Sequence, residues 1–231
     1  MSRTLDVATS FLASGARFAL GMKVTHRARR PEKLLELYEF EACPFCRKVR
    51  EALSAFDLEA KVFPCTPGGT RYRPTVVERG GKAQFPYLVD PNAGVAMYES
   101  DAIIRHLATT YGDGSVPALL RLGPLTALTS SFASMWRLGH GRAARPSKLP
   151  AQALELYSYE ASPYSRIARE ALCELEIPYV LHNVAQGSQG RRAFAERSGK
   201  MQVPWLHDPN TGTSMFESAE IVAYLRQTYG A

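Results

Sequence analysis

Two cysteines separated by two residues are the part of this sequence best suited to chemistry. Cys43 and Cys46 follow an apolar run at 34–40 and precede a helix-like run at 47–56. A cysteine at the start of a helix meets unpaired backbone N–H groups and the positive end of the helix dipole, and both stabilise a thiolate. We therefore expect Cys43 to be a nucleophile and Cys46, one turn later, to be its redox partner.

The residues around the motif strengthen this interpretation. Pro44 suits the first position of a helix, because it has no N–H to lose there. Arg47 and Lys48 would add positive charge within one turn of the motif. We expect the pKa of Cys43 to fall, while the pKa of Cys46 stays near that of an ordinary thiol.

Half of a zinc site is the alternative for this motif. A structural zinc ion needs four ligands, and the other two cysteines, Cys65 and Cys173, form no second pair. We interpret Cys65 as a bystander and Cys173, inside a predicted helix, as a core residue. The five histidines show no ligand spacing, so we predict no metal site.

The composition is that of an ordinary globular protein with a basic excess. The chain has 231 residues, 45% of them hydrophobic, and a formal net charge of +6. The excess positive charge lies in 1–33 and 113–152, whereas 34–112 and 153–231 are slightly acidic. We interpret the basic segments as solvated linkers and predict no nucleic-acid partner. Four cysteines do not make a disulfide framework, which favours a reducing, cytoplasmic compartment.

The second half of the chain repeats the first. At an offset of 119, Cys-Pro-Phe-Cys at 43–46 corresponds to Ser-Pro-Tyr-Ser at 162–165. Further matches have an offset of 118, namely Phe85-Pro86 with Val203-Pro204 and Glu99-Ser100 with Glu217-Ser218. The pattern predicts a tandem duplication. Its predicted parts are a helix and basic tail at 1–33, a domain at 34–112, a linker with the repeated helix at 113–152, and a second domain at 153–231.

A weaker repeat precedes each domain. The segments 4–22 and 124–139 carry apolar side chains at helical spacing, and each runs into a basic tail. The first segment alone could be a transit peptide, but its internal copy favours a structural helix. We expect these helices to pack on the domains or on each other, with adsorption to a membrane surface as the alternative. Arg17 and Arg137 interrupt the apolar stretch that a membrane span requires.

Both domains are predicted to have one order of elements, βαβ, then α, then ββα. In the first we expect strand 34–40, helix 44–56, strand 59–64, helix 72–80, hairpin 86–98 and helix 100–111. In the second we expect strand 154–159, helix 163–176, strand 178–183, helix 190–198, hairpin 203–216 and helix 218–229. Ser100 is the expected N-cap of its helix.

On these residues the two domains resemble the thioredoxin superfamily, and within it the glutaredoxins and the N-terminal domain of glutathione transferases. The resemblance rests on Cys-Pro-Phe-Cys after the first strand, Pro86 before the third strand and Glu99-Ser100 at the last helix. The Cys-Pro-Phe-Cys motif is most similar to the microsomal prostaglandin E synthase 2 type. The resemblance implies an α/β protein of two tandem thioredoxin-like folds, each preceded by an amphipathic helix.

The resemblance also implies a glutathione site. Pro86 and Pro204 would be cis and would face the turn at the motif. The backbone of Phe85 would bind the cysteinyl part of glutathione, while Glu99 and Ser100 hold its γ-glutamyl end. Elementary chemistry agrees, because a carboxylate binds an ammonium group and a helix N-terminus binds a carboxylate. Simple helix capping is the alternative role for Glu99 and Ser100. In the second domain the corresponding residues are Val203, Pro204, Glu217 and Ser218.

The resemblance implies a glutathione-dependent thiol–disulfide oxidoreductase. Cys43 would attack a mixed disulfide, and Cys46 would resolve the intermediate or stay idle. The second domain, with Ser162 and Ser165, would keep the fold, lose the exchange chemistry and still offer a glutathione site. The runner-up is a glutathione transferase or isomerase, although no helical transferase domain follows either copy in this sequence. A third reading is a non-catalytic pseudo-dimer within the chain that binds glutathione, a metal cluster or a protein partner.

Overall fold

The computed structural model describes residues 10, 21–121 and 140–231, which form two copies of one α/β unit. The first copy contains β1 (Leu35–Glu39), α2 (Pro44–Phe56), β2 (Ala60–Pro64), α3 (Arg73–Gly80), β3 (Tyr87–Asp90), β4 (Val95–Tyr98) and α4 (Ser100–Thr110). The short 3-10 helix η1 (Ala118–Leu120) follows it. The second copy contains β5 (Leu154–Ser158), α6 (Pro163–Glu174), β6 (Tyr179–Asn183), α7 (Arg191–Ser198), β7 (Trp205–Asp208), β8 (Thr213–Phe216) and α8 (Ser218–Tyr229). The predicted order of elements is confirmed in both copies.

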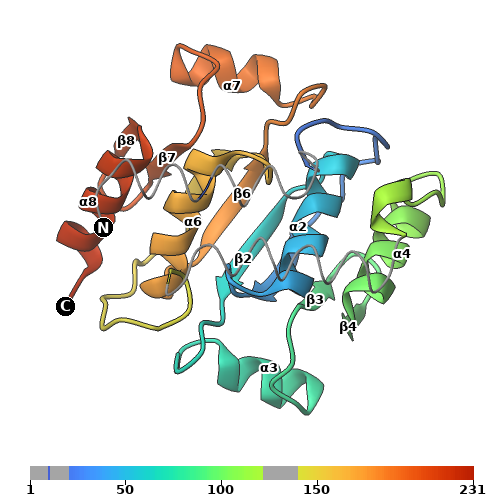
Figure 1. Cartoon of the computed structure of the whole chain (residues 1–231), viewed down its shortest axis with the longest axis horizontal. Helices are drawn as coiled ribbons and strands as arrows, with labels where there is room; N and C mark the ends of the chain where they lie inside the picture. The colour runs from blue at the N-terminus through green and yellow to red at the C-terminus, as the bar shows by residue number, and fades with distance from the viewer. Residues whose placement is uncertain (1–9, 11–20, 122–139) are drawn as a thin grey trace.

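The two copies share one eight-stranded mixed sheet in the order β4-β3-β1-β2-β6-β5-β7-β8 (Figure 1). Within each copy the first two strands are parallel and the hairpin strands are antiparallel. The copies meet where β2 pairs antiparallel with β6, with Val62 opposite Tyr179. Because these strands run in opposite directions, α2 and α6 also run in opposite directions across the centre of the sheet. The copies therefore form a pseudo-dimer within one chain.

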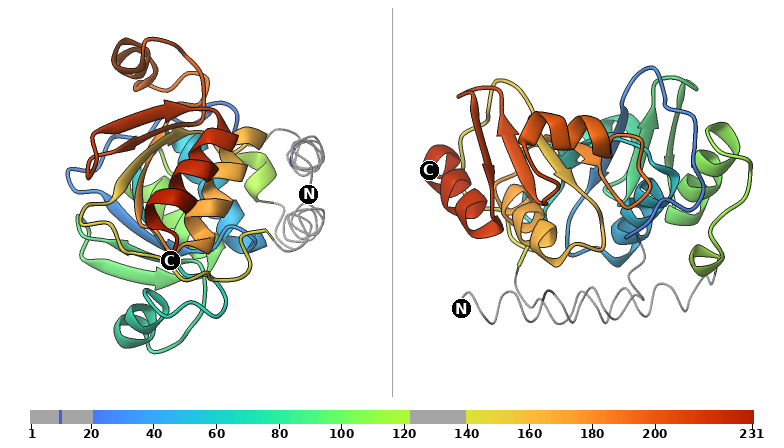
Figure 2. Two further views of the ribbon diagram at one scale, coloured as in Figure 1. Left: turned by 90° about the vertical axis from the view of Figure 1, so that its left-hand side faces the viewer. Right: turned by 90° about the horizontal axis from the view of Figure 1, so that it is seen from above.

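Helices cover one face of the sheet more fully than the other. On that face α2 packs with α4, and α6 packs with α8. Figure 2 shows these four helices in one layer, with α3 and α7 away from it at opposite ends of the molecule. Leu37 belongs to the core under α2 and α4, whereas its neighbour Tyr38 packs with Val76 of α3. Since successive strand residues point to opposite faces, α3 lies across the sheet from α2.

Helix α2 has the predicted bounds because residues at its two ends fix where it starts and stops. Pro44 occupies its first turn, and the helix stops at Asp57, which takes up the left-handed conformation with φ 59°. The corresponding helix α6 ends two residues before its predicted end at 176. Glu176 has φ 48°, a conformation that cannot continue an α-helix. The apolar pattern alone did not contain this signal.

The two predicted amphipathic helices, 4–22 and 124–139, lie outside the described residues except at Ser10, Gly21 and Met22. Ser10 is helical and buried, and its hydroxyl donates a hydrogen bond to the carbonyl of Pro163, 2.6 Å away. Among the helices that the structure describes, none combines the length and the apolar character needed to cross a membrane.

Candidate thiol site and its counterpart

The first copy brings the motif against the cis proline. Cys43 is the N-cap of α2, and its Sγ accepts a hydrogen bond from the backbone N–H of Cys46, 3.3 Å away. The same sulfur lies 4.0 Å from the carbonyl oxygen of Phe85. The peptide bonds before Pro86 and before Pro204 are both cis, as the resemblance implied. Cys43, Cys46, Phe85 and Pro86 thus form one local cluster.

The two thiols of the motif have opposite electrostatic environments. Hydrogen bonds from the Cys46 side chain and backbone lower the pKa of Cys43 and outweigh the effect of burial, in the direction predicted from the helix start. Burial and the neighbouring Cys43 raise the pKa of Cys46 well above that of an ordinary thiol. The prediction of an ordinary pKa for Cys46 is therefore wrong, because this side chain is fully buried in the core. Cys43 is therefore the thiol of the pair that ionises first.

The basic side chains after the motif do not act on Cys43 as predicted. The guanidinium of Arg47 pairs with Glu51 at 3.1 Å and lies 3.9 Å from Glu160. The ammonium of Lys48 pairs with Asp101 of α4 at 2.5 Å. Both cations are thus neutralised by carboxylates. The pKa of Cys43 depends on hydrogen bonds at the helix start.

The last helix of the first copy begins without a side-chain cap. Its N-cap is Glu99, with φ 68°, and the Glu99 side chain makes no capping hydrogen bond. Ser100 is the first residue of α4 rather than its N-cap, which corrects the prediction. The carboxylate of Glu99 instead accepts a hydrogen bond from Nε2 of Gln84, 2.5 Å away. Helix capping by Glu99 is therefore not observed, and the first-turn N–H groups of α4 have no cap from it.

The second copy builds the same cluster without sulfur. Ser162 is the N-cap of α6, and its Oγ accepts hydrogen bonds from the backbone N–H of Ser165 at 3.2 Å and from its hydroxyl at 2.9 Å. The Val203-Pro204 peptide bond is cis. Glu217 has φ 63°, and its carboxylate accepts from Gln202 at 2.6 Å. Ser218 starts α8 and is buried, as Ser100 is in α4.

Sequence reasoning missed two kinds of residue at these sites. The glutamines Gln84 and Gln202 hold the two glutamates, and their equivalent positions in the repeat were the available signal. Glu39, at the end of β1, is buried, and its charge raises the pKa of both Cys43 and Cys46. The repeat has Ser158 at that position, so a carboxylate is present only in the copy that has thiols.

The other two cysteines lie away from this cluster. Cys65 follows β2 and is buried, which raises its pKa. Cys173 of α6 is buried between the copies, where its Sγ lies 3.2 Å from the hydroxyl of Thr66. Its prediction as a core residue is confirmed. Within the described ranges, no group of three or more His, Cys, Asp or Glu side chains has an arrangement that could hold a metal ion.

Comparison with known families agrees with this geometry. The sequence profile of the glutathione S-transferase N-terminal domain matches residues 37–119 and 156–231, more than half of the chain. The chain belongs to this family. Each matched segment contains one of the two clusters described above, so the family assignment supports a glutathione-related function for the protein.

One solved structure of a glutathione transferase is also similar to part of this chain. It is a delta-class enzyme from Nilaparvata lugens, 30% identical, with a TM-score of 0.29. The match covers 34% of this chain and 37% of that one, so this chain spans little more than a third of its length. No curated protein matches the sequence.

Proposed function

We propose that this protein is a glutathione-dependent thiol–disulfide oxidoreductase in which Cys43 is the nucleophile. The proposal rests on the difference in pKa between the two thiols of the motif. Two sulfur-bearing residues share one helix start, and the pKa of Cys43 is lowered while that of Cys46 is raised. In such a pair Cys43 ionises at lower pH than Cys46 and supplies the attacking thiolate.

The exchange chemistry balances with glutathione as the reductant. The Cys43 thiolate attacks the glutathione sulfur of a mixed disulfide, the S–S bond breaks, and the substrate leaves as a thiolate that takes up a proton. A thiolate of free glutathione then attacks the glutathione sulfur now bound to Cys43, which releases oxidised glutathione and regenerates Cys43. In this cycle the sulfur of free glutathione is oxidised from the thiol to the disulfide level, and the substrate sulfur is reduced from the disulfide to the thiol level. The glutathione sulfur of the mixed disulfide stays at the disulfide level throughout. Because the pKa of Cys46 is raised, this monothiol route is favoured over attack by Cys46.

The residues of the first copy fit glutathione at three points. The backbone of Phe85, next to the cis peptide bond, would hold the cysteinyl part close to Cys43. The carboxylate of Glu99 would bind the γ-glutamyl ammonium group. The hydroxyl of Ser100 and the first-turn N–H groups of α4 would bind the α-carboxylate, since Glu99 does not cap them.

The second copy would bind glutathione without exchanging disulfides. Val203, Pro204, Glu217 and Ser218 have the same arrangement as their counterparts in the first copy. Ser162 has a hydroxyl where Cys43 has a thiol, and a hydroxyl is not ionised at neutral pH. It could donate a hydrogen bond to a bound glutathione thiolate.

Membership of a transferase family favours a second candidate function. In a glutathione transferase or isomerase, the Cys43 region would bind and position glutathione, and no disulfide with the protein would form. The similarity of the motif to the microsomal prostaglandin E synthase 2 type points to the same alternative. The two functions differ in whether Cys43 becomes covalently linked to glutathione.

Intermediate trapping separates these candidates. The full chain carrying Cys46→Ser is mixed with a glutathionylated peptide, quenched with acid and measured by intact mass spectrometry. The proposal predicts one glutathione per chain on Cys43, and no adduct when Cys43→Ser is added. A parallel assay follows conjugation of glutathione to 1-chloro-2,4-dinitrobenzene. Conjugation without any adduct would reject the oxidoreductase in favour of the transferase. If neither an adduct nor conjugation is found, the remaining candidate is a non-catalytic binding protein.

A further inference from the structure

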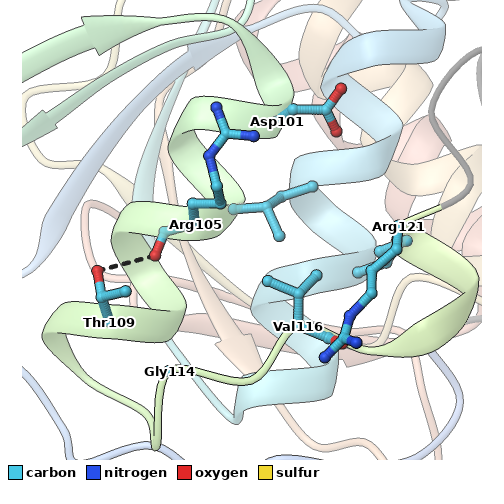
Figure 3. Close-up of a pocket in the computed structure, with 8 residues that line it drawn as sticks. Asp101, Arg105, Thr109, Gly114, Val116 and Arg121 are labelled. Atoms are coloured by element: carbon cyan, nitrogen blue, oxygen red, sulfur yellow. Dashed lines mark hydrogen bonds between the residues drawn. The ribbon is translucent and has the colours of Figure 1, made fainter.

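A cavity of about 450 Å³ lies beside α4. It separates α4 from the segment that follows it in the chain (Figure 3). The residues that line it include Ile104, Arg105 and Thr109 of α4, and Val116, Leu120 and Arg121 of that segment. Its volume is within the range of small-molecule sites, which is roughly 300 to 1,000 Å³.

The floor of the cavity is apolar and belongs to the core. Ile104 and Leu120 are 1% and 2% exposed and are members of the cluster under α2 and α4. Val116 packs against the same cluster. A floor that is fixed by core packing gives a preformed surface for an apolar group.

Two arginines stand at the rim of this floor. Figure 3 draws Arg105 and Arg121 from opposite sides of the cavity, one on α4 and the other at the end of the following segment. The Nε of Arg121 donates to the carbonyl of Val116 at 2.7 Å, which leaves its terminal N–H groups for other contacts. Both arginines are exposed. Among the described residues, no side chain pairs with the guanidinium of Arg105.

Among the described residues that line the cavity, Asp101 is the one carboxylate, and it is already neutralised. Asp101 lines the end nearest the start of α4 and pairs with Lys48 of α2 at 2.5 Å. The remaining charge at the rim is therefore positive. A ligand that packs on the apolar floor and pairs with the arginines at the rim needs an apolar body and a negative head group.

We propose that this cavity binds a small amphipathic anion, such as a medium-length aliphatic carboxylate. The apolar body lies against Val116 and the edges of Ile104 and Leu120, and the positive charge of the rim arginines, Arg105 and Arg121, attracts the carboxylate. None of these residues belongs to the thiol cluster, so this site goes beyond the proposed thiol–disulfide chemistry and does not depend on it.

The second copy supports a specific role for these residues. The position of Arg105 is Ala223 in α8, that of Asp101 is Ala219, and that of Lys48 is Ile167. The same fold is thus built without the rim cation and without the Lys48–Asp101 ion pair. These charged residues are not required by the fold, and they occur together beside the cavity of the first copy.

Calorimetric titration of the full chain with octanoate and with octan-1-ol tests the proposal. The wild type should bind octanoate and should bind the neutral alcohol at least about tenfold more weakly, because the alcohol lacks the charge-assisted hydrogen bonds. The double variant Arg105→Ala/Arg121→Ala should weaken octanoate to the level of the alcohol. Thr109→Trp, which fills the cavity from the rim, should remove binding of both ligands.

The matched control is Arg226→Ala, which removes an exposed arginine from α8, away from the lining residues. It should leave octanoate binding unchanged. Because both rim arginines are exposed, the double variant should have the circular dichroism spectrum and melting temperature of the wild type. Equal octanoate affinity in the wild type and the double variant, equal affinity for octanoate and octanol, or no binding by the wild type would each overturn the proposal.

Discussion

Arg50 of α2 and Glu160, which precedes α6, form a buried ion pair between the two copies, with Nε 3.0 Å from Oε2. Arg169 of α6 makes the equivalent contact with Glu41, which precedes α2, also at 3.0 Å. All four side chains are at most 3% exposed. Helices α2 and α6 are therefore each held by a carboxylate from the turn that precedes the other helix.

We expect Arg50→Ala to destabilise the whole chain strongly. It removes the ion-pair partner of Glu39 and one of the partners of Glu160, which also pairs with Arg169. Breaking a buried ion pair from one side costs about 3–5 kcal/mol, because a carboxylate remains buried without its cation. Urea unfolding measures the change. The control is Arg192→Ala, since the Arg192 side chain is 91% exposed and pairs with an exposed glutamate. Equal midpoints for both variants would contradict the prediction.

Glu39 should make stability depend on pH near neutrality. Burial raises the pKa of Glu39 from 4.5 to about 7. A carboxyl group with a raised pKa favours the folded state below its unfolded pKa, and this contribution is lost as the pH rises through 7. At Glu160 burial alone would raise the pKa, but four nearby arginines outweigh it and lower the pKa to about 2. The stability that ionised Glu160 contributes is therefore lost only in strong acid. Glu39→Gln should reduce the fall in unfolding free energy between pH 5 and 8. An unchanged slope in urea titrations would contradict this assignment.

Local patterns predicted the elements, and the repeat predicted their order. Pro44 at the start and an apolar stripe along α2 were enough to place that helix, because these signals lie within the element itself. The pairing of Val62 with Tyr179 was not predictable. The sequence of a strand at the edge of one copy does not specify which other strand it pairs with. The burial of Arg50 and Arg169 depends on the same pairing of the two copies. Charged residues on a helix ordinarily indicate a solvated face, so the sequence did not predict this burial. The raised pKa of Cys46 follows from core packing and not from its place in the motif.

Cys43 should be the first cysteine to react with a small alkylating reagent. The hydrogen bonds at the start of α2 lower its pKa, while burial raises the pKa values of Cys46, Cys65 and Cys173. The rate of reaction with iodoacetamide should therefore show an inflection below the ordinary thiol pKa. Cys43 is only 4% exposed, so a bulky maleimide should react more slowly. Peptide mapping that finds another cysteine labelled first near pH 7 would reject the assignment.

Restoring sulfur to the second copy should give a reactive thiol pair. In Ser162→Cys/Ser165→Cys, the α6 start and the cis bond before Pro204 remain. The carboxylate of Glu39, which raises the pKa of both thiols in the first copy, has no counterpart there, because Ser158 occupies its position. Activity is measured in a Cys43→Ser background, with glutathione binding followed by calorimetry. Failure of the restored copy to bind glutathione would show that its loss of function extends beyond the thiols.

The most direct test of the account is a glutathione-coupled reduction assay with a glutathionylated peptide. The wild type should turn over, Cys43→Ser should lose activity to background, and Cys46→Ser should retain a substantial fraction through the monothiol route. Cys65→Ser is the matched control, because this buried thiol lies outside the cluster, and it should keep the wild-type rate. Full activity in Cys43→Ser, or loss of activity in Cys65→Ser with the fold intact, would contradict the central claim that Cys43 is the nucleophile.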